Sequence, residues 1–146
     1  MRTLLLTNLF LTSCAGNPAQ RATLIDPILR PFIEQFEADM VSLGIKYELS
    51  DVRSIMISKD LPRGALASCN VHWRGNETAK FIIVHPVVVL QGKWDVIYHE
   101  LGHCLFDLSH SPDPNSIMYA EDVHTAAWFN DNAEAALADF KQLIES

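Results

Sequence analysis

The residues with the clearest chemical meaning in this sequence lie between positions 99 and 110, which read HELGHCLFDLSH. If the segment begins as a helix, His99 and His103 stand about one turn apart, and their imidazole rings project from the same face. Two such rings can bind one Zn²⁺ ion, and Glu100 beside them can act as a general base. The spacing therefore predicts a catalytic zinc site.

The third zinc ligand is expected to be His110, because a catalytic zinc ion has three protein ligands and keeps a position open for water. In a continuous helix His110 would lie about 10 Å further along the axis than His103, too far away to share the ion. The helix must therefore end first, in a turn at residues 106–109. Asp107 is one of the few residue types that tolerate a left-handed backbone there. Asp113 is the alternative third ligand.

These residues resemble the metzincin clan of zinc endopeptidases, in which the motif HExxHxxGxxH is soon followed by a turn carrying a methionine. Residues 116–119 resemble that turn, and the resemblance implies that Met118 forms a hydrophobic base beneath the metal. The sequence of these motifs is especially similar to that of matrixin-like and small bacterial or phage lipoprotein-type members. Two positions depart from the motif, since Phe106 replaces its glycine and Ser109 its third histidine. His110 matches only if the turn contains one extra residue.

The resemblance covers residues 95–119 and implies a zinc-dependent endopeptidase, in which Glu100 is the general base for a water held by the metal. It also implies a minimal metzincin-like α+β fold, with a twisted mixed sheet, a backing helix, an active-site helix and a small C-terminal subdomain that ends in a helix. By analogy, the strand at 66–73 would pair with an extended substrate. Residues 119–128 would wall the pocket for the side chain after the cut.

Three alternatives remain open for the same zinc motif. A gluzincin-type peptidase would take a glutamate as its third ligand, for which Glu121 and Glu134 are the candidates. A non-catalytic envelope lipoprotein would bind zinc structurally, although structural sites usually have four protein ligands. A cytosolic zinc hydrolase is the third. Calcium binding is also open, because three scattered acidic residues form no recognisable loop motif; these are Asp113, Asp122 and Asp131.

The amino terminus has the features of a secretory signal. Arg2 precedes a short apolar stretch at 4–11, which is too short to span a bilayer. The ending Leu-Thr-Ser-Cys resembles a bacterial lipobox, which implies cleavage before Cys14 and lipidation of that residue. We therefore expect a signal peptide at 1–13, a tether at 14–26, and a location in the cell envelope or outside the cell. An ordinary secretory signal or a cytosolic start is the alternative.

The composition limits the range of partners. The chain has 146 residues and a formal net charge of −7, so its surface repels nucleic acid and anionic lipid. We expect a monomer that acts on peptides or proteins and meets the membrane only through its lipid anchor. Residues 27–146 suffice for a single domain. The resemblance divides it into an upper subdomain at 27–106 and a lower one at 107–146.

Cys69 and Cys104 remain once the leader is removed. In an oxidising compartment they can form a disulfide between the active-site helix and the sheet. Two buried free thiols are the alternative.

Helices are predicted on either side of the zinc motif. Apolar residues at helical spacing indicate one helix at 27–43, ended by Gly44, and a closing helix at 133–144. Leu137, Phe140, Leu143 and Ile144 would face inward. Asp95 is placed to cap the zinc helix.

Strands are predicted between the first helix and the zinc motif. Alternating apolar and polar residues indicate a strand at 52–58. Two further strands at 66–73 and 80–85, joined by a turn at 74–76, predict a hairpin. We expect residues 87–90 to extend its second strand.

Overall fold

The computed structural model describes residues 22–146. The predicted signal peptide at 1–13 and the lipidation site at Cys14 lie outside the described residues. So does the tether, except for its last five residues. Within the described part, no helix has both the length and the apolar character needed to cross a bilayer.

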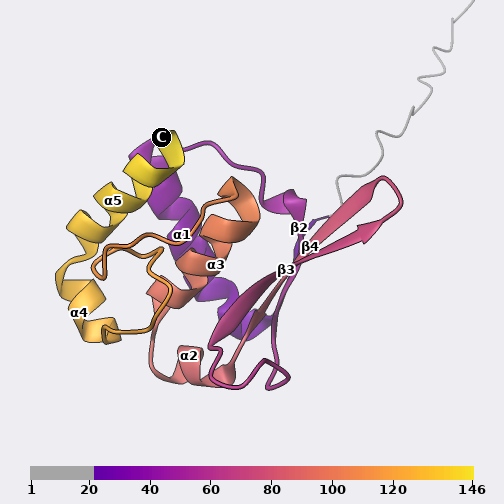
Figure 1. The fold of residues 1–146 in the computed structure, drawn as a ribbon, viewed down its shortest axis with the longest axis horizontal. Helices are drawn as coiled ribbons and strands as arrows, with labels where there is room; N and C mark the ends of the chain where they lie inside the picture. The colour runs from indigo at the N-terminus through magenta and orange to yellow at the C-terminus, as the bar shows by residue number, and fades with distance from the viewer. Residues whose placement is uncertain (1–21) are drawn as a thin grey trace, which may run out of the picture.

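The fold of residues 22–146 combines one mixed sheet with five α-helices, which confirms the α+β prediction (Figure 1). In chain order the elements are β1 (Leu24–Ile25), the 3-10 turn η1 (Pro27–Leu29), α1 (Arg30–Leu43), the 3-10 turn η2 (Leu49–Asp51), β2 (Val52–Ile57), β3 (Ala67–Arg74), β4 (Glu77–Val84), α2 (Pro86–Leu90), α3 (Trp94–Phe106), α4 (Ala126–Asp131) and α5 (Ala133–Glu145).

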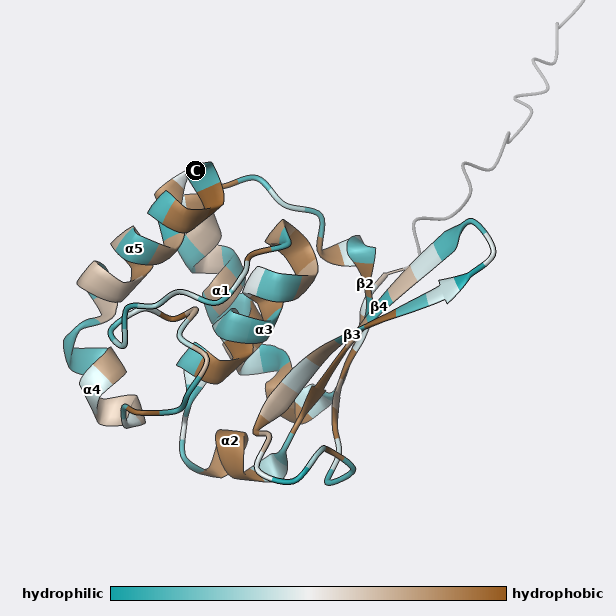
Figure 2. Cartoon of the chain, viewed as in Figure 1, coloured by the Kyte–Doolittle hydropathy of each residue, from teal (hydrophilic) through white to brown (hydrophobic). Residues whose placement is uncertain are grey.

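The sheet has the order β1-β2-β4-β3. β1, β2 and β4 run parallel, and β3 is antiparallel to β4 as the other half of the predicted hairpin. This hairpin reaches well beyond the helices, and its tip is hydrophilic, whereas the part nearer the helices is hydrophobic (Figures 1 and 2). β3 is therefore an edge strand, and its outer backbone groups pair with no other strand of the described sheet.

The first strand corrects the predicted start of the domain. Leu24 and Ile25 were assigned to the tether, but they pair in parallel with Ser54 and Ile55 of β2. The Asp26 N–H continues this pairing by donating to the Ile55 carbonyl at 2.9 Å. A two-residue strand carries no readable alternation of its own, so only its partner strand defines it.

The hydrophobic core lies where α1 and α3 pack with the sheet. α1 buries Ile33, Phe36 and Met40, which follow the helical spacing of its apolar residues. Tyr98 of α3 is fully buried against Phe36, with the two rings at 90° and 5.0 Å between centroids. Its hydroxyl donates to Asp39 Oδ2 at 2.6 Å. This pair fixes α3 against α1.

The closing helix α5 turns all four predicted residues toward the core, and Phe140 is the one among them that is fully buried. Ala136 and Phe140 are the buried residues of α5. Three of the four residues expected to face the core are half-buried; these are Leu137, Leu143 and Ile144. The structure thus gives Phe140 the central position in this contact.

Residues 86–90 do not extend the hairpin strand as predicted; they form the helix α2. Pro86 has no N–H to donate to a strand ladder, and it suits the first turn of a helix. His85 supplies the N-cap, since its Nδ1 accepts from the Val87 N–H at 3.2 Å. The β-branched side chains favoured a strand by propensity, but the cap and the proline determine the outcome.

The predicted capping role of Asp95 is wrong as well. Lys93 occupies the N-cap position of α3 without a side-chain cap, and Asp95 lies inside the first turn. Its carboxylate is buried rather than exposed at the helix end.

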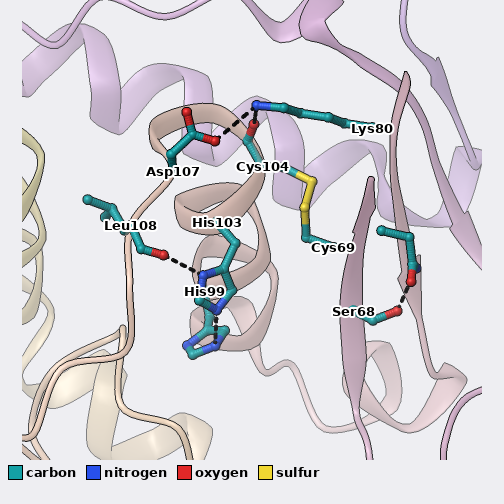
Figure 3. Close-up of a disulfide and its surroundings, with 9 residues drawn as sticks. Ser68, Cys69, Lys80, His99, His103, Cys104, Asp107 and Leu108 are labelled. Carbon is teal, nitrogen blue, oxygen red and sulfur yellow. Dashed lines mark hydrogen bonds and ion pairs between the residues drawn. A yellow bond between two sulfur atoms is a disulfide. The ribbon is translucent and has the colours of Figure 1, made fainter. Parts of the chain in front are cut away.

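Cys69 of β3 and Cys104 of α3 form a disulfide, with 5.7 Å between their Cα atoms (Figure 3). Lys80 of β4 adds a polar link, because its Nζ donates to the Cys104 carbonyl at 2.6 Å and to Asp107 Oδ1 at 3.2 Å. The helix that carries the histidines and its C-cap residue are thus tied to β3 by a covalent bond and to β4 by two hydrogen bonds.

Replacing both Cys69 and Cys104 with alanine is expected to lower the free energy of unfolding by about 2–4 kcal/mol, because the bond closes a loop between residues 35 apart in sequence. In thermal unfolding this corresponds to a fall in Tm on the order of 10 °C. A thiol titration of the denatured, unreduced protein that found both cysteines free would contradict the disulfide.

Candidate metal centre

α3 places His99, Glu100 and His103 on consecutive turns, and it ends where the third histidine must return. Asp107 closes the helix with a left-handed backbone, φ 53° and ψ 31°. Among residues 22–146 it is the one residue other than glycine with a positive φ. The structure therefore shows the predicted turn, with the left-handed backbone at Asp107 and with Phe106 still helical.

The turn brings the imidazole of His110 back to the two rings on α3. The Nε2 atom of His103 lies 3.0 Å from that of His99 and 3.2 Å from that of His110. The ligand atoms of the three residues all lie within 4.8 Å of one another. The three side chains predicted to bind the metal are thus brought together.

The outer nitrogens of the α3 histidines fix which way the lone pairs point. The Ile117 carbonyl lies 2.8 Å from His99 Nδ1. The Leu108 carbonyl lies 2.6 Å from His103 Nδ1 (Figure 3). A carbonyl oxygen can only accept a hydrogen bond, so each Nδ1 carries the proton. Each Nε2 therefore presents a lone pair to the other rings.

His99 and His103 do not take up a second proton at neutral pH, because the pKa of each imidazole is lowered. Burial, with smaller contributions from the neighbouring His103 and His110, lowers the pKa of His99 to about 4, although the hydrogen bond to the Ile117 carbonyl acts in the opposite direction. Burial is also the main cause that lowers the pKa of His103. Neutral imidazoles are the form that binds metal ions.

The donor set fits zinc. A tetrahedral zinc ion with nitrogen ligands at about 2.0–2.1 Å would hold them about 3.3 Å from one another. Two of the Nε2 separations, 3.0 and 3.2 Å, are close to that value. Lone pairs at these distances repel each other, and a cation among them removes the repulsion.

Glu100 is buried next to the three histidines, with 8% of its surface exposed. Burial raises the pKa of its carboxyl to about 7, and a hydrogen bond from the Cys69 backbone partly offsets that rise. A carboxyl group with this pKa exchanges a proton readily near neutral pH.

Residues 116–119 form a turn held from both sides. The Ser116 hydroxyl donates to Asp139 Oδ2 of α5 at 2.6 Å and accepts from the Met118 N–H at 3.2 Å. The Met118 carbonyl accepts from the Ser111 N–H at 2.8 Å, directly after His110. The turn thus orients His99 through Ile117 and secures the segment that carries the third histidine.

Met118 is fully buried against α3 at Gly102. A Cβ atom at position 102 would lie 2.5 Å from Met118 Sδ and 3.1 Å from Phe140 Cε2. The sequence analysis did not single out Gly102. A glycine within a helix costs about 1 kcal/mol relative to alanine. Its presence there was therefore the feature of the sequence that indicated a close packing contact.

Gly102→Ala is expected to destabilise the protein by about 1–3 kcal/mol, because the added methyl group overpacks the contact with Met118. In a Met118→Ala background the same change should cost less than half as much, since the methyl group then has room. Denaturant unfolding of the two single variants and the double variant measures this coupling. Equal costs in both backgrounds would contradict the contact.

A cavity of about 380 Å³ opens at the histidines. Glu100 and residues 64–69, which include the start of β3, line one side. The other side comprises Pro114, Ser116, Ile117 and residues 119–124. Most of the segment predicted to wall a substrate pocket, 119–128, therefore does face a cavity beside the site.

The other acidic candidates do not join the histidines. In the part of the chain that the structure describes, no other group of three or more histidine, cysteine, aspartate or glutamate residues could share a metal ion. Asp113 instead accepts from the Asn115 N–H at 2.9 Å in its own turn. The histidine group does not include Glu121 or Glu134, the two glutamates considered as third ligands. It does not include Asp122 or Asp131, the other aspartates considered for calcium.

Models of known protein families, curated proteins and solved structures were compared with this chain, and none of them matches it. Inferences about its function therefore depend on the geometry of this site.

Proposed function

We propose that this chain is a zinc-dependent endopeptidase of minimal metzincin-like architecture, with His99, His103 and His110 as the metal ligands and Glu100 as the general base. The observation that carries the proposal is the convergence of three Nε2 atoms, two of them shown to be lone-pair donors by the carbonyls at their Nδ1 atoms. This arrangement suits one divalent cation.

The chemistry divides between the metal and the carboxylate. Zinc bound there would act as a Lewis acid that lowers the pKa of water to about 7 and polarises a peptide carbonyl. Glu100 accepts the proton of the attacking water and returns it to the leaving amine. A pKa of about 7 suits Glu100 to both steps.

Three protein ligands favour catalysis over a structural role. Structural zinc sites are usually closed by four protein ligands, whereas catalytic sites keep a position for water or substrate. The group at this site contains three histidines. The adjoining cavity supplies the space that a substrate needs.

The edge strand β3 supports an extended peptide as the substrate. Its residues 67–69 line the cavity, and Cys69 contacts Glu100 through its backbone. An extended peptide can add to such an edge through main-chain hydrogen bonds. It would then lie across the histidines with chain on both sides of the cleaved bond, which is the geometry of an endopeptidase.

The cellular location is part of the proposal. The signal-like start, the lipobox-like Cys14 and the Cys69–Cys104 disulfide agree with an oxidising compartment. We propose a monomer in the cell envelope or secreted, anchored by lipid where Cys14 is modified. The net charge of −7 disfavours nucleic acid as a partner.

The direct test is cleavage of a proteome-derived peptide library by the purified protein. We expect cleavage that a zinc chelator abolishes and one equivalent of zinc per chain restores, with metal content measured in parallel. Stoichiometric zinc without cleavage of any peptide would instead favour the non-catalytic lipoprotein.

A further inference from the structure

A buried carboxylate at the end of the cavity has no role in the proposed hydrolysis. Asp95 lies one helical turn before His99 on α3 and lines the same cavity. Only 6% of the surface of Asp95 is exposed. Its Oδ1 atom has no hydrogen-bond partner among the described residues. Buried polar groups are normally satisfied, so this atom requires an explanation.

The nearest cation does not neutralise Asp95. Lys93 is buried two residues earlier, but its Nζ donates to Asp122 Oδ1 and, at 3.0 Å, to the His124 carbonyl. Burial raises the pKa of Asp95 to about 6, although the positive charge of Lys93 acts in the opposite direction. The backbone N–H groups of Asp95 and Val96 also lower the pKa of this carboxyl by hydrogen bonding, but its Oδ1 atom is left without a partner. A buried acceptor without a partner is costly.

The cavity that contains the histidines and Asp95 has both polar and apolar lining residues. Val96, Ile117 and Phe129 are among the apolar ones. A lysine or arginine side chain combines an apolar stem with a cationic head, and it is long enough to span one helical turn. The stem would contact these apolar side chains, while the head would form a charge-assisted hydrogen bond with the free carboxylate.

We propose that this cavity binds the lysine or arginine side chain of a peptide residue adjoining the scissile bond, and that Asp95 is the specificity-determining residue. The inference rests on the proposed peptidase function and names its substrate class. Glu121 also lines the cavity, but it is exposed to water. A charge there contributes much less to selection because solvent screens it.

The test compares cleavage of matched peptides that carry arginine, lysine or norleucine beside the cleaved bond. We expect the wild-type protein to prefer the basic peptides, with kcat/KM about tenfold or more above that for norleucine. Asp95→Asn should remove this preference, so that kcat/KM for the basic peptides falls to about that for norleucine. Asp131→Asn makes the same chemical change at an exposed residue outside the cavity, and it should keep the preference.

A binding measurement separates this inference from the peptidase proposal. Acetyl-arginine methylamide, titrated into zinc-loaded Glu100→Gln protein, should shift the amide NMR signals of residues 95 and 96 saturably. Acetyl-norleucine methylamide should not, and neither should the arginine probe when Asp95→Asn is added.

The outcomes are distinguishable. Failure to cleave any peptide would end the peptidase proposal, while arginine binding at Asp95 would still support the cationic pocket. Cleavage without a basic preference, a preference that survives Asp95→Asn, or the absence of arginine-specific shifts would each overturn the inference about Asp95.

Discussion

Glu100→Gln is expected to lower kcat for peptide hydrolysis by about 10²- to 10⁴-fold while one zinc ion per chain is retained. Glutamine has nearly the shape of glutamate, and its amide oxygen can keep the hydrogen bond from the Cys69 backbone. It cannot accept a proton from water at neutral pH. Initial rates with a quenched fluorescent peptide, together with metal analysis, measure both parts of the prediction.

Glu134→Gln is the matched control, because it makes the same chemical change on an exposed residue of α5. We expect its activity and zinc content to equal those of the wild-type protein. Activity within tenfold of wild type in Glu100→Gln would show that Glu100 is not the base. Loss of zinc from Glu134→Gln would point to a glutamate ligand.

His110→Ala is expected to weaken zinc binding by more than about 100-fold. Loss of a residue that only hydrogen-bonds to a metal ligand typically weakens binding by roughly 10- to 100-fold, and loss of a ligand itself should cost more. Two histidines would remain where three converge, and hydrolysis should fall with zinc occupancy. The side chain of His110 is exposed, so its removal leaves the core intact. Competition for zinc against a chromogenic chelator gives the affinity, and circular dichroism checks the fold.

Glu121→Gln distinguishes the two types of third ligand. With His110 as the ligand, zinc affinity in Glu121→Gln should match that of the wild-type protein. A gluzincin-type site with Glu121 as the third ligand requires the reverse pattern, in which Glu121→Gln loses zinc and His110→Ala retains it.

The sequence predicts the part of the site that depends on local geometry. His99 and His103 share a face because helical periodicity dictates it, and Asp107 was identified by its tolerance of a left-handed backbone. The hairpin and the first helix follow equally local patterns. The position of β3 at the edge of the sheet came from the family resemblance, because strand order is not a local property.

The missed features depend on contacts between distant residues or on a balance of opposing local preferences. Residues 86–90 carry strand propensity, yet a proline and a histidine cap make them helical. Gly102 shows its purpose only when Met118, 16 positions later, packs against it. Asp95 was expected at a solvated helix end, and only the tertiary structure, in which Lys93 pairs with Asp122, reveals it as a buried carboxylate whose Oδ1 has no hydrogen-bond partner.

The left-handed residue at the end of α3 also bears on how such centres tolerate changes in chain length. Asp107 turns the backbone out of the helix, so that the imidazole of His110 returns to those of His99 and His103. For a metal centre of the proposed kind, the direction in which the backbone leaves the helix would then matter more than the number of residues between the second and third histidines.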